Sequence, residues 1–263
     1  MGSQKEAVTP VRKRGERKRR ERRRKRILRF LKILLCIVII LGVLIFAFIF
    51  VFILKNVKVT GNEHYTEEEV LDALSYEEDG YHNTIIFYFT HRDASIETLP
   101  YIKEVQVKIG GIDTIKIEVT ERTLLGGIAN GEEYVYVDTE GYVCEISDEL
   151  EEGVLLLEGI ACESPQVNEL LEVADSSIFG SIYDLLLLLE ENGLTVSEVG
   201  FDENSLLHVQ IDEITVVFGN FDSLEDKILE VNTLLPNLEG LSGTLHLENY
   251  DSSTDSIVFT KDS

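Results

Sequence analysis

The sequence predicts an α+β protein body held at a membrane by a single N-terminal transmembrane helix, and three observations carry this prediction. Residues 1–32 contain 15 of the 24 Lys and Arg of the chain. An uncharged apolar run follows, and the rest of the chain combines many short strand patterns with a few helical ones. Residues 56–263 carry eight Lys and Arg against 45 Asp and Glu. This charge asymmetry favours a membrane protein over a cytosolic enzyme. A hydrophobic content of 44% and only three Cys argue against a disordered chain and a disulfide-dense mini-protein.

The apolar run extends from Ile33 to Leu54, which we take as the two ends of a membrane anchor. Its 22 residues would form a helix of about 33 Å, which matches a hydrocarbon core of about 30 Å. A signal peptide has a shorter apolar region of about 7–15 residues followed by a small-residue cleavage site. No A-x-A pattern follows Leu54, so the sequence predicts an uncleaved anchor.

The basic residues before the span predict its orientation. Dense Lys and Arg beside a transmembrane helix stay in the cytoplasm, so residues 1–32 are expected inside and the acidic part outside the cell. A nucleic-acid-binding tail is the alternative interpretation. The basic run 17–26 has no aromatic residue for base stacking, which favours a topology signal that also contacts anionic lipid heads.

The first section after the span reads as strand, helix, helix, strand and strand. Thr66 and Glu69 have the spacing of a capping box, so a helix is expected from there to about Leu74. Gly110 and Gly111 separate two alternating segments and predict a hairpin turn. The remaining elements expected here are a strand at 57–60, a short helix at 94–99 ended by Pro100, and strands at 105–109 and 115–119.

The second section reads as strands with two helices. Residues 124–132 contain three Gly and are expected to form a glycine-containing joint. Apolar residues at helical spacing predict one helix at 178–189 and another at 224–235, with Ser223 as the N-cap of the second. Lys227, the one base in a long acidic stretch, is expected to pair with neighbouring acids. Expected strands are 134–138, 142–146, 196–201, 206–211, 214–218, 244–247 and 256–260.

No residue pattern predicts a catalytic site, a metal site or a cofactor site. Cys144 lies in a strand-like segment beside Glu145, a setting that raises a thiol pKa and disfavours a nucleophile. The five His lack metal-ligand spacing. A glycosidase would need a specific carboxylate pair and usually aromatic platforms, and the chain has no Trp. We expect Cys144 and Cys162 to be free thiols. A disulfide between them is the alternative, because disulfides can persist outside the cell.

Four segments follow the basic tail and the span: 57–62 (VKVTGN), 102–108 (IKEVQVK), 114–122 (TIKIEVTER) and 136–141 (YVDTEG). In this order they resemble the FtsQ/DivIB family of bacterial division proteins. The resemblance implies a POTRA domain followed by a mixed, largely antiparallel β domain. The expected organisation is a basic cytoplasmic tail at 1–32, a transmembrane helix at 33–54, the POTRA domain at 55–123 and the β domain at 124–263, with an edge strand near the C-terminus.

The resemblance also implies a function and a site. The protein would be a non-enzymatic, single-pass scaffold at the division septum, without cofactor, small-molecule substrate or nucleic acid. It would bind FtsL-type and DivIC/FtsB-type partners outside the membrane and, through them, support septal peptidoglycan synthases. A partner strand would add to segment 256–260, which gives Tyr250, Ile257, Val258 and Phe259 as binding residues. Glu121 and Arg122 would fix the joint between the two domains. The alternative is a membrane-anchored extracellular sensor or wall-binding module with a POTRA-like domain.

Overall fold

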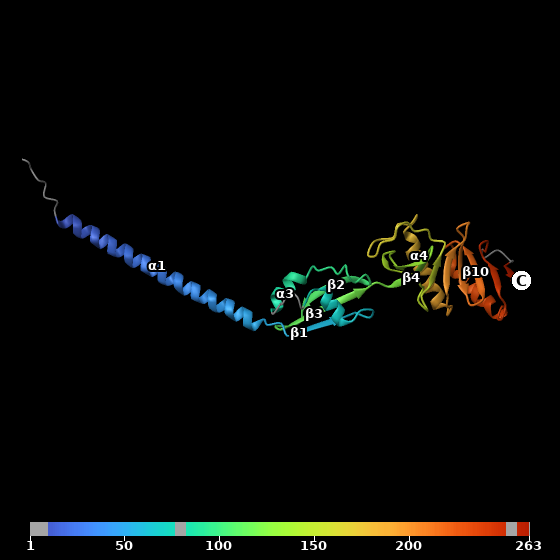
Figure 1. Cartoon of the computed structure of the whole chain (residues 1–263), viewed down its shortest axis with the longest axis horizontal. Helices are drawn as coiled ribbons and strands as arrows, with labels where there is room; N and C mark the ends of the chain where they lie inside the picture. Colours follow the sequence, from blue (N-terminus) through green and yellow to red (C-terminus); the bar gives the residue numbers. More distant parts are fainter. Residues whose placement is uncertain (1–9, 77–82, 251–256, 263) are drawn as a thin grey trace, which may run out of the picture. The chain divides into compact units, whose positions relative to one another are not determined.

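The computed structural model describes residues 10–76, 83–250 and 257–262, with side chains from Arg23 onward. The first nine residues of the basic tail and Ser256 of the predicted last strand therefore lie outside the described part. The chain divides into two compact units. The first consists of 1–58, 79–92 and 107–116, and the second consists of 59–78, 93–106 and 117–263. Figure 1 shows the elements in chain order.

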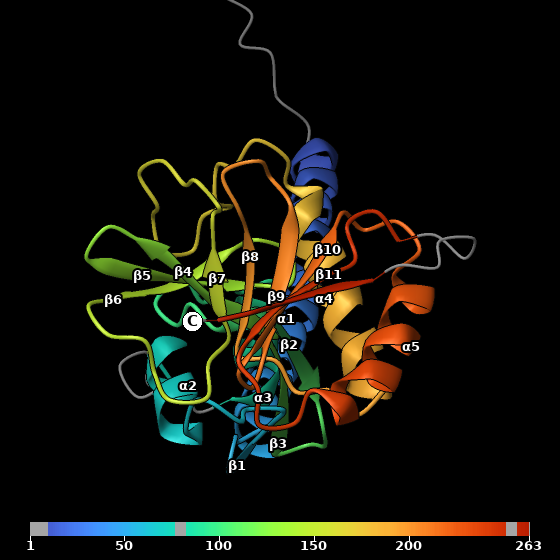
Figure 2. The ribbon, with the colours of Figure 1, turned by 90° about the vertical axis from the view of Figure 1, so that its right-hand side faces the viewer.

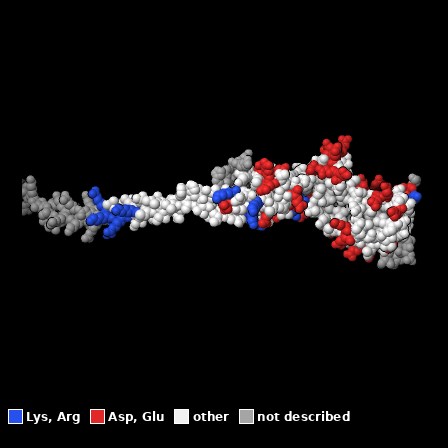
Figure 3. Space-filling view, turned by 90° about the horizontal axis from the view of Figure 1, so that it is seen from below, with Lys and Arg blue, Asp and Glu red and all other residues white. Residues whose placement is uncertain are grey.

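The N-terminal helix α1 spans Pro10–Val51. Its segment Arg23–Val51 is, within the described part of the chain, the one helix long and apolar enough to cross a membrane, and its side chains are exposed. Figure 3 shows the Lys and Arg among the first described side chains of α1, from Arg23 onward, in blue, followed by a stretch without charged residues. The helix ends three residues before Leu54, which was expected as the outer end of the anchor. Leu54 is only 8% exposed, because it packs into the protein body rather than continuing the helix.

A three-stranded sheet follows, with strand order β1-β3-β2. The predicted capping box is confirmed, since the Thr66 side chain accepts from the Glu69 N–H and the Glu69 carboxylate accepts from the Thr66 N–H. The predicted hairpin at Gly110 and Gly111 is also confirmed, with both N–H groups donating to the carbonyl of Thr114. The elements are β1 (Asn56–Thr60), α2 (Glu67–Ala73), α3 (Thr84–His91), β2 (Ile102–Ile109) and β3 (Thr114–Glu121).

The short helix predicted at 94–99 is wrong, because this segment is irregular. Pro100 disfavours a helical Leu99, and so few residues cannot sustain an isolated helix. The second helix of this region is α3 instead. Its N-cap is Asn83, whose side-chain oxygen accepts from the N–H groups of Ile85 at 3.0 Å and Ile86 at 3.2 Å.

The larger sheet has nine strands in the order β12-β11-β10-β9-β8-β7-β4-β5-β6. Its pairs are antiparallel except for β10 with β11, β4 with β7 and β7 with β8, so it is mixed and largely antiparallel as predicted. The strands are β4 (Leu124–Asn130), β5 (Glu133–Asp138), β6 (Val143–Ser147), β7 (Leu156–Glu158), β8 (Glu198–Phe201), β9 (Leu207–Ile211), β10 (Ile214–Gly219), β11 (Gly243–His246) and β12 (Val258–Lys261).

The glycine-containing joint predicted at 124–132 is wrong for most of its length, because β4 occupies it. Two of its glycines serve close packing rather than flexibility. A Cβ on Gly126 would lie 2.6 Å from the carbonyl oxygen of Leu155, and one on Gly127 would lie 2.7 Å from Leu150 Cδ1. The strand β7, which the sequence did not predict, pairs with β4 at this place.

The main core lies between the larger sheet and the helices α4 (Ser177–Glu191) and α5 (Leu224–Leu234). Figure 2 shows both helices against the sheet. Phe179 and Ile182 of α4 and Ile228 of α5 are completely buried. Ser223 occupies the N-cap position of α5 as predicted, but its backbone is left-handed and its side chain makes no cap hydrogen bond.

Lys227 of α5 is buried, with 2% of its surface exposed. The prediction that it pairs with acids is wrong. Its Nζ donates to the carbonyl of Phe218 at 2.7 Å and to Asn220 Oδ1 at 3.4 Å. Burial lowers the pKa of Lys227 because it penalises the charged form, while Asp222 and Glu248 act in the opposite direction.

Candidate functional site

The strand β12 stands at one end of the nine-stranded order, so within the described residues one of its edges has no neighbouring strand. It pairs with β11 alone, with Thr244 opposite Thr260 and Leu245 opposite Phe259. Gly243 permits this pairing. A Cβ there would overlap the carbonyl oxygen of Thr260 and would lie 2.8 Å from Phe259 Cζ.

The hydrogen-bond pattern fixes which backbone groups of β12 face outward. Asp262 N–H donates to the carbonyl of Ser242 at 3.0 Å, and these two residues are directly opposite each other. Hydrogen-bonded pairs alternate in an antiparallel ladder, so Thr260 and Val258 also bond toward β11. The N–H and C=O groups of Phe259 and Lys261 consequently point away from β11, toward the open edge.

The side chains predicted to bind a partner divide into two groups. Tyr250, Ile257 and Phe259 are half-buried and pack against the main core. Val258 is 56% exposed, because neighbouring residues of a strand face opposite sides of the sheet. Ile257 and Phe259 thus hold β12 on the protein, Tyr250 packs on the same core, and Val258 presents apolar surface beside the open backbone groups.

Arg122 follows β3 and makes a nearly buried ion pair. Its Nη1 lies 2.7 Å from Asp138 Oδ2, and the two side chains are only 11% and 3% exposed. The guanidinium carbon also lies 4.2 Å from the centre of the Tyr142 ring, a cation–π distance. The planar guanidinium is suited to this double contact, whereas a lysine ammonium is not.

Asp138 also organises the turn between β5 and β6. Its Oδ1 accepts from the N–H groups of Glu140 at 2.9 Å and Tyr142 at 2.8 Å. The Arg122 N–H, in turn, donates to the carbonyl of Tyr101 at 2.7 Å. Arg122 therefore links the start of β2, through its backbone, to the β5–β6 turn, through its side chain.

Three further contacts within the second unit connect the same regions. Tyr101 Oη donates to Glu145 Oε2 at 3.1 Å, and Lys103 Nζ lies 2.7 Å from Glu140 Oε2. Asn168 Nδ2 donates to the carbonyl of Glu97 at 2.6 Å. The sequence analysis found none of these partners, because only the fold brings residues so far apart in the chain together.

Glu121 has a different role from the adjacent Arg122. Its carboxylate accepts from the N–H of His64 at 2.9 and 3.1 Å and from the N–H of Tyr65 at 3.3 Å. It thereby fixes the loop between β1 and α2. The predicted pair thus acts at two places, with Glu121 on this loop and Arg122 on the β5–β6 turn.

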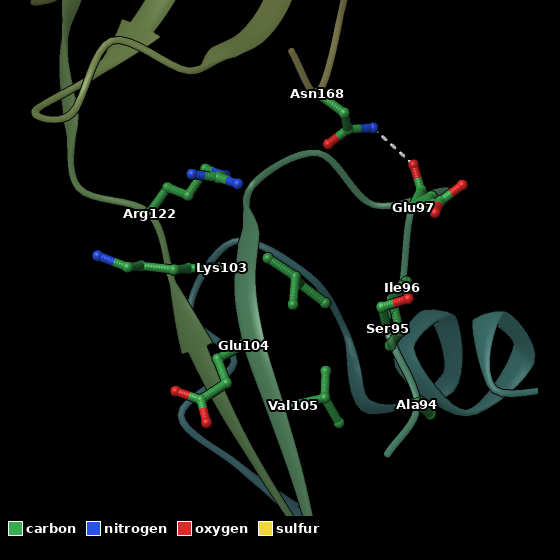
Figure 4. A pocket seen from close by; sticks show the side chains of 10 residues that line it. Ala94, Ser95, Ile96, Glu97, Lys103, Glu104, Val105, Arg122 and Asn168 are labelled. Atoms are coloured by element: carbon green, nitrogen blue, oxygen red, sulfur yellow. Dashed lines mark hydrogen bonds between the residues drawn. The ribbon is translucent and has the colours of Figure 1, made fainter. Parts of the chain in front are cut away.

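A shallow pocket of about 260 Å³ lies beside Arg122, between β2 and segment 94–97. Figure 4 shows Ile96 and Val105 on its two sides, and the hydrogen bond from Asn168 to Glu97 at its rim. Its walls combine apolar side chains with both signs of charge. This mixture of side chains does not match the chemistry of a particular small molecule.

Cys144 is unsuited to nucleophilic chemistry. It is 2% exposed, and burial, reinforced by the charge of Asp138, raises its pKa to about 12. The predicted direction of the shift is confirmed. A thiolate is the reactive form of Cys, so this environment suppresses reactivity at neutral pH. Cys36, Cys144 and Cys162 are all free thiols. In the part of the chain that the structure describes, no group of His, Cys, Asp and Glu could hold a metal ion.

Comparison with known proteins gives two kinds of match. The model of the POTRA domain of FtsQ type matches residues 52–122. The "Cell division protein DivIB" of Clostridium acetobutylicum is 29% identical over 196 residues, which cover 70% of this chain and 74% of that protein. The protein of the same name from Clostridium tetani is 22% identical over 197 residues, 73% of each chain. The chain therefore contains a POTRA domain of FtsQ type, and it is similar over about 70% of its length to cell division proteins named DivIB.

Proposed function

We propose that this protein is a non-enzymatic scaffold of the bacterial division complex, anchored in the membrane by one helix and acting at the septum. Residues 1–32 lie in the cytoplasm, the apolar part of α1 from 33 to 51 forms the span, and the POTRA domain up to residue 123 and the β domain at 124–263 lie outside. The FtsQ-type POTRA domain, the similarity to DivIB proteins, the basic flank of α1 and the suppressed reactivity of Cys144 support this proposal.

Its partners are membrane proteins of the FtsL and DivIC/FtsB types, and septal peptidoglycan synthases are reached through them. The observation that carries this proposal is the open edge of β12, where the backbone groups of Phe259 and Lys261 point away from β11. A partner strand adds there by β-augmentation. Val258 supplies the apolar contact, Ile257 and Phe259 keep the strand on the sheet, and Tyr250 packs on the same core.

The length of this edge sets what the partner must contribute. Each main-chain hydrogen bond is worth about 0.5–1.5 kcal/mol net, and the outward groups of Phe259 and Lys261 offer about four such bonds, or roughly 2–6 kcal/mol. A micromolar complex needs about 8 kcal/mol, beyond the cost of association. The partner must therefore also bury side chains against β12, which makes Val258 a specificity contact.

Capture of partner ectodomains by the full-length protein tests this assignment. Val258→Lys places a charge at the open edge, and Lys261→Pro removes one outward N–H without touching the bonds to β11. Both variants should fold and lose capture. Leu229→Lys on α5 is the matched control, because Leu229 is 59% exposed and Val258 is 56% exposed. Unchanged capture by both edge variants would refute the β12 site.

Localisation and depletion test the wider proposal. A fluorescent fusion should gather at division sites, and depletion should block septation. Normal division with altered transcription after depletion would favour the alternative of an extracellular sensor. Turnover of wall fragments by the purified protein, abolished by Cys144→Ala, would contradict the non-enzymatic assignment.

A further inference from the structure

The first unit carries exposed apolar side chains next to the outer end of α1. Among the described residues after α1, nine large hydrophobic side chains are exposed, and four of them lie in the short stretches 83–92 and 107–116. We call these four the membrane-proximal patch. They are Ile86 (47% exposed), Phe89 (63%), Ile109 (45%) and Ile112 (60%).

Direct hydrogen bonds attach α3 to the end of α1. The Thr84 N–H donates to the carbonyl of Phe52 at 2.8 Å, and Asn83 Nδ2 donates to the carbonyl of Phe48 at 3.3 Å. Phe89 follows Asn83 by six residues, which is about 9 Å along a helix. The headgroup layer on each side of a bilayer is about 5–8 Å thick. If α1 spans the membrane, Phe89 therefore lies close to the lipid surface whatever the tilt of α3.

The helix α3 has a face suited to that position. Ile86 and Phe89 are three residues apart and share the outward side, whereas Phe87 is completely buried against the protein. Tyr88 lies between them and Arg92 follows, with its guanidinium 5.7 Å from the Phe89 ring. Aromatic and long basic side chains are typical of the boundary between lipid tails and headgroups.

The hairpin between β2 and β3 is attached in the same way. The carbonyl of Asp113, at its tip, accepts from the N–H groups of Lys55 at 2.9 Å and Asn56 at 3.1 Å. The neighbouring Ile112 is 60% exposed. The patch thus combines two segments, each held by the residues that immediately follow α1.

The charge of these stretches is opposite to that of the rest of the exterior. Residues 55–58, 83–92 and 107–116 contain five bases (Lys55, Lys58, Arg92, Lys108 and Lys116) and one acid, Asp113, which pairs with Lys55 at 3.7 Å. The rest of the chain beyond Leu54 has four Lys and Arg and more than 40 acids. Figure 3 shows blue side chains just beyond the uncharged helix. Bases close to a membrane surface attract anionic lipid headgroups.

From this combination we infer that the first unit docks on the outer surface of its own membrane, with Ile86, Phe89 and Ile112 inserted among the lipids and the surrounding bases on anionic headgroups. The occupant of the patch is a lipid surface rather than another protein. Docking restrains the first unit at the bilayer. The inference rests on the proposed membrane span, and not on the proposed partners.

Tryptophan fluorescence of the full-length protein in nanodiscs, one molecule per disc, tests the inference directly. The chain has no Trp, so each introduced Trp is the only reporter. The variants are Phe89→Trp in the patch, Phe46→Trp in α1 and Leu229→Trp on α5, with parent residues that are 63%, 62% and 59% exposed. Lipids with brominated chains serve as the quencher, and phosphatidylglycerol supplies the anionic headgroup.

We expect quenching at Phe89→Trp and Phe46→Trp but not at Leu229→Trp. The emission of Phe89→Trp should also shift to shorter wavelength than that of Leu229→Trp, and its quenching should fall when phosphatidylglycerol is replaced by phosphatidylcholine. Quenching at Phe46→Trp alone overturns lipid docking and leaves the anchor intact. A blue shift at Phe89→Trp without quenching also overturns it, because a protein contact then covers the patch. No quenching at Phe46→Trp overturns the span, and this inference with it.

Discussion

Replacing Arg122 by Met should destabilise the protein far more than replacing an exposed base in the same region. The substitution keeps most of the aliphatic length and removes the positive charge. Asp138 would then remain 97% buried on its side chain without its ionic partner. Asp138 Oδ1 can still accept hydrogen bonds from the N–H groups of Glu140 and Tyr142. The substitution therefore removes the ionic partner of Asp138 Oδ2 and the cation–π contact with the Tyr142 ring.

The magnitude follows from burial. Removing one partner of a buried ion pair typically costs about 3–5 kcal/mol, because it leaves an uncompensated charge. Arg122 is 11% exposed, so the lower end of this range applies. For a domain of about 150–250 residues, each kcal/mol lowers Tm by about 2–4 °C, which gives a drop of about 6–12 °C for a loss of about 3 kcal/mol.

Thermal unfolding followed by circular dichroism measures this drop. The matched control is Lys103→Gln, which breaks an ion pair to the same turn. Lys103 and Glu140 are 46% and 50% exposed, so solvent screens them and the cost should stay below about 1 kcal/mol. Equal Tm values for Arg122→Met and Lys103→Gln would refute the reasoning that burial makes the Arg122 pair structurally important.

Three more predictions concern local structure. Gly61→Ala should cost more than Gly153→Ala in urea unfolding. Both positions have a positive φ that costs Ala about 1 kcal/mol or more, but only a Cβ at Gly61 overlaps the carbonyl of Val119. Thr66→Ala should lose about 1 kcal/mol in the same assay through its capping box, and an unchanged midpoint would argue against that cap. Cys144, with a pKa raised to about 12 from 9.0, should react with iodoacetamide at pH 8 about 10³-fold more slowly than a thiol of ordinary pKa, as measured by mass spectrometry. Rapid labelling of the folded protein would contradict the raised pKa. Because the folded state favours the protonated thiol, the thiol's contribution to the free energy of unfolding is complete below pH 9 and is lost as the pH rises toward 12.

Local sequence signals predicted the elements that depend on neighbours in the chain. The capping box at Thr66 and the hairpin at Gly110 involve residues within five positions of each other, so their spacing alone was sufficient. The apolar run of α1 was equally clear, because its character does not depend on tertiary contacts. The larger sheet was predicted in type, since most of its strands alternate apolar and polar residues.

Elements that depend on distant contacts were missed. The glycines of β4 resemble a flexible joint in sequence, and only the close approach of Leu155 and Leu150 explains them. The helix α3 was missed although Asn83 is a good N-cap before an apolar run. That run, TIIFYFTH, lacks a polar face, because its outward side carries Ile86 and Phe89.

The residues of the candidate site were predicted from the family resemblance, whereas their contacts and orientations were revealed only by the structure. The sequence placed Glu121 and Arg122 next to each other but could not show that their side chains serve different loops. It also gave Ile257, Val258 and Phe259 equal roles. The register with β11 separates the inward Ile257 and Phe259 from the outward Val258.

Amide hydrogen exchange of the full-length protein, with and without a DivIC/FtsB-type partner ectodomain, tests strand addition most directly. The N–H groups of Phe259 and Lys261 point away from β11, so they should exchange rapidly in the free protein and become protected in the complex. The amide of Thr260, already bonded toward β11, should change less. Partner binding that leaves the Phe259 and Lys261 amides as unprotected as before would contradict the account.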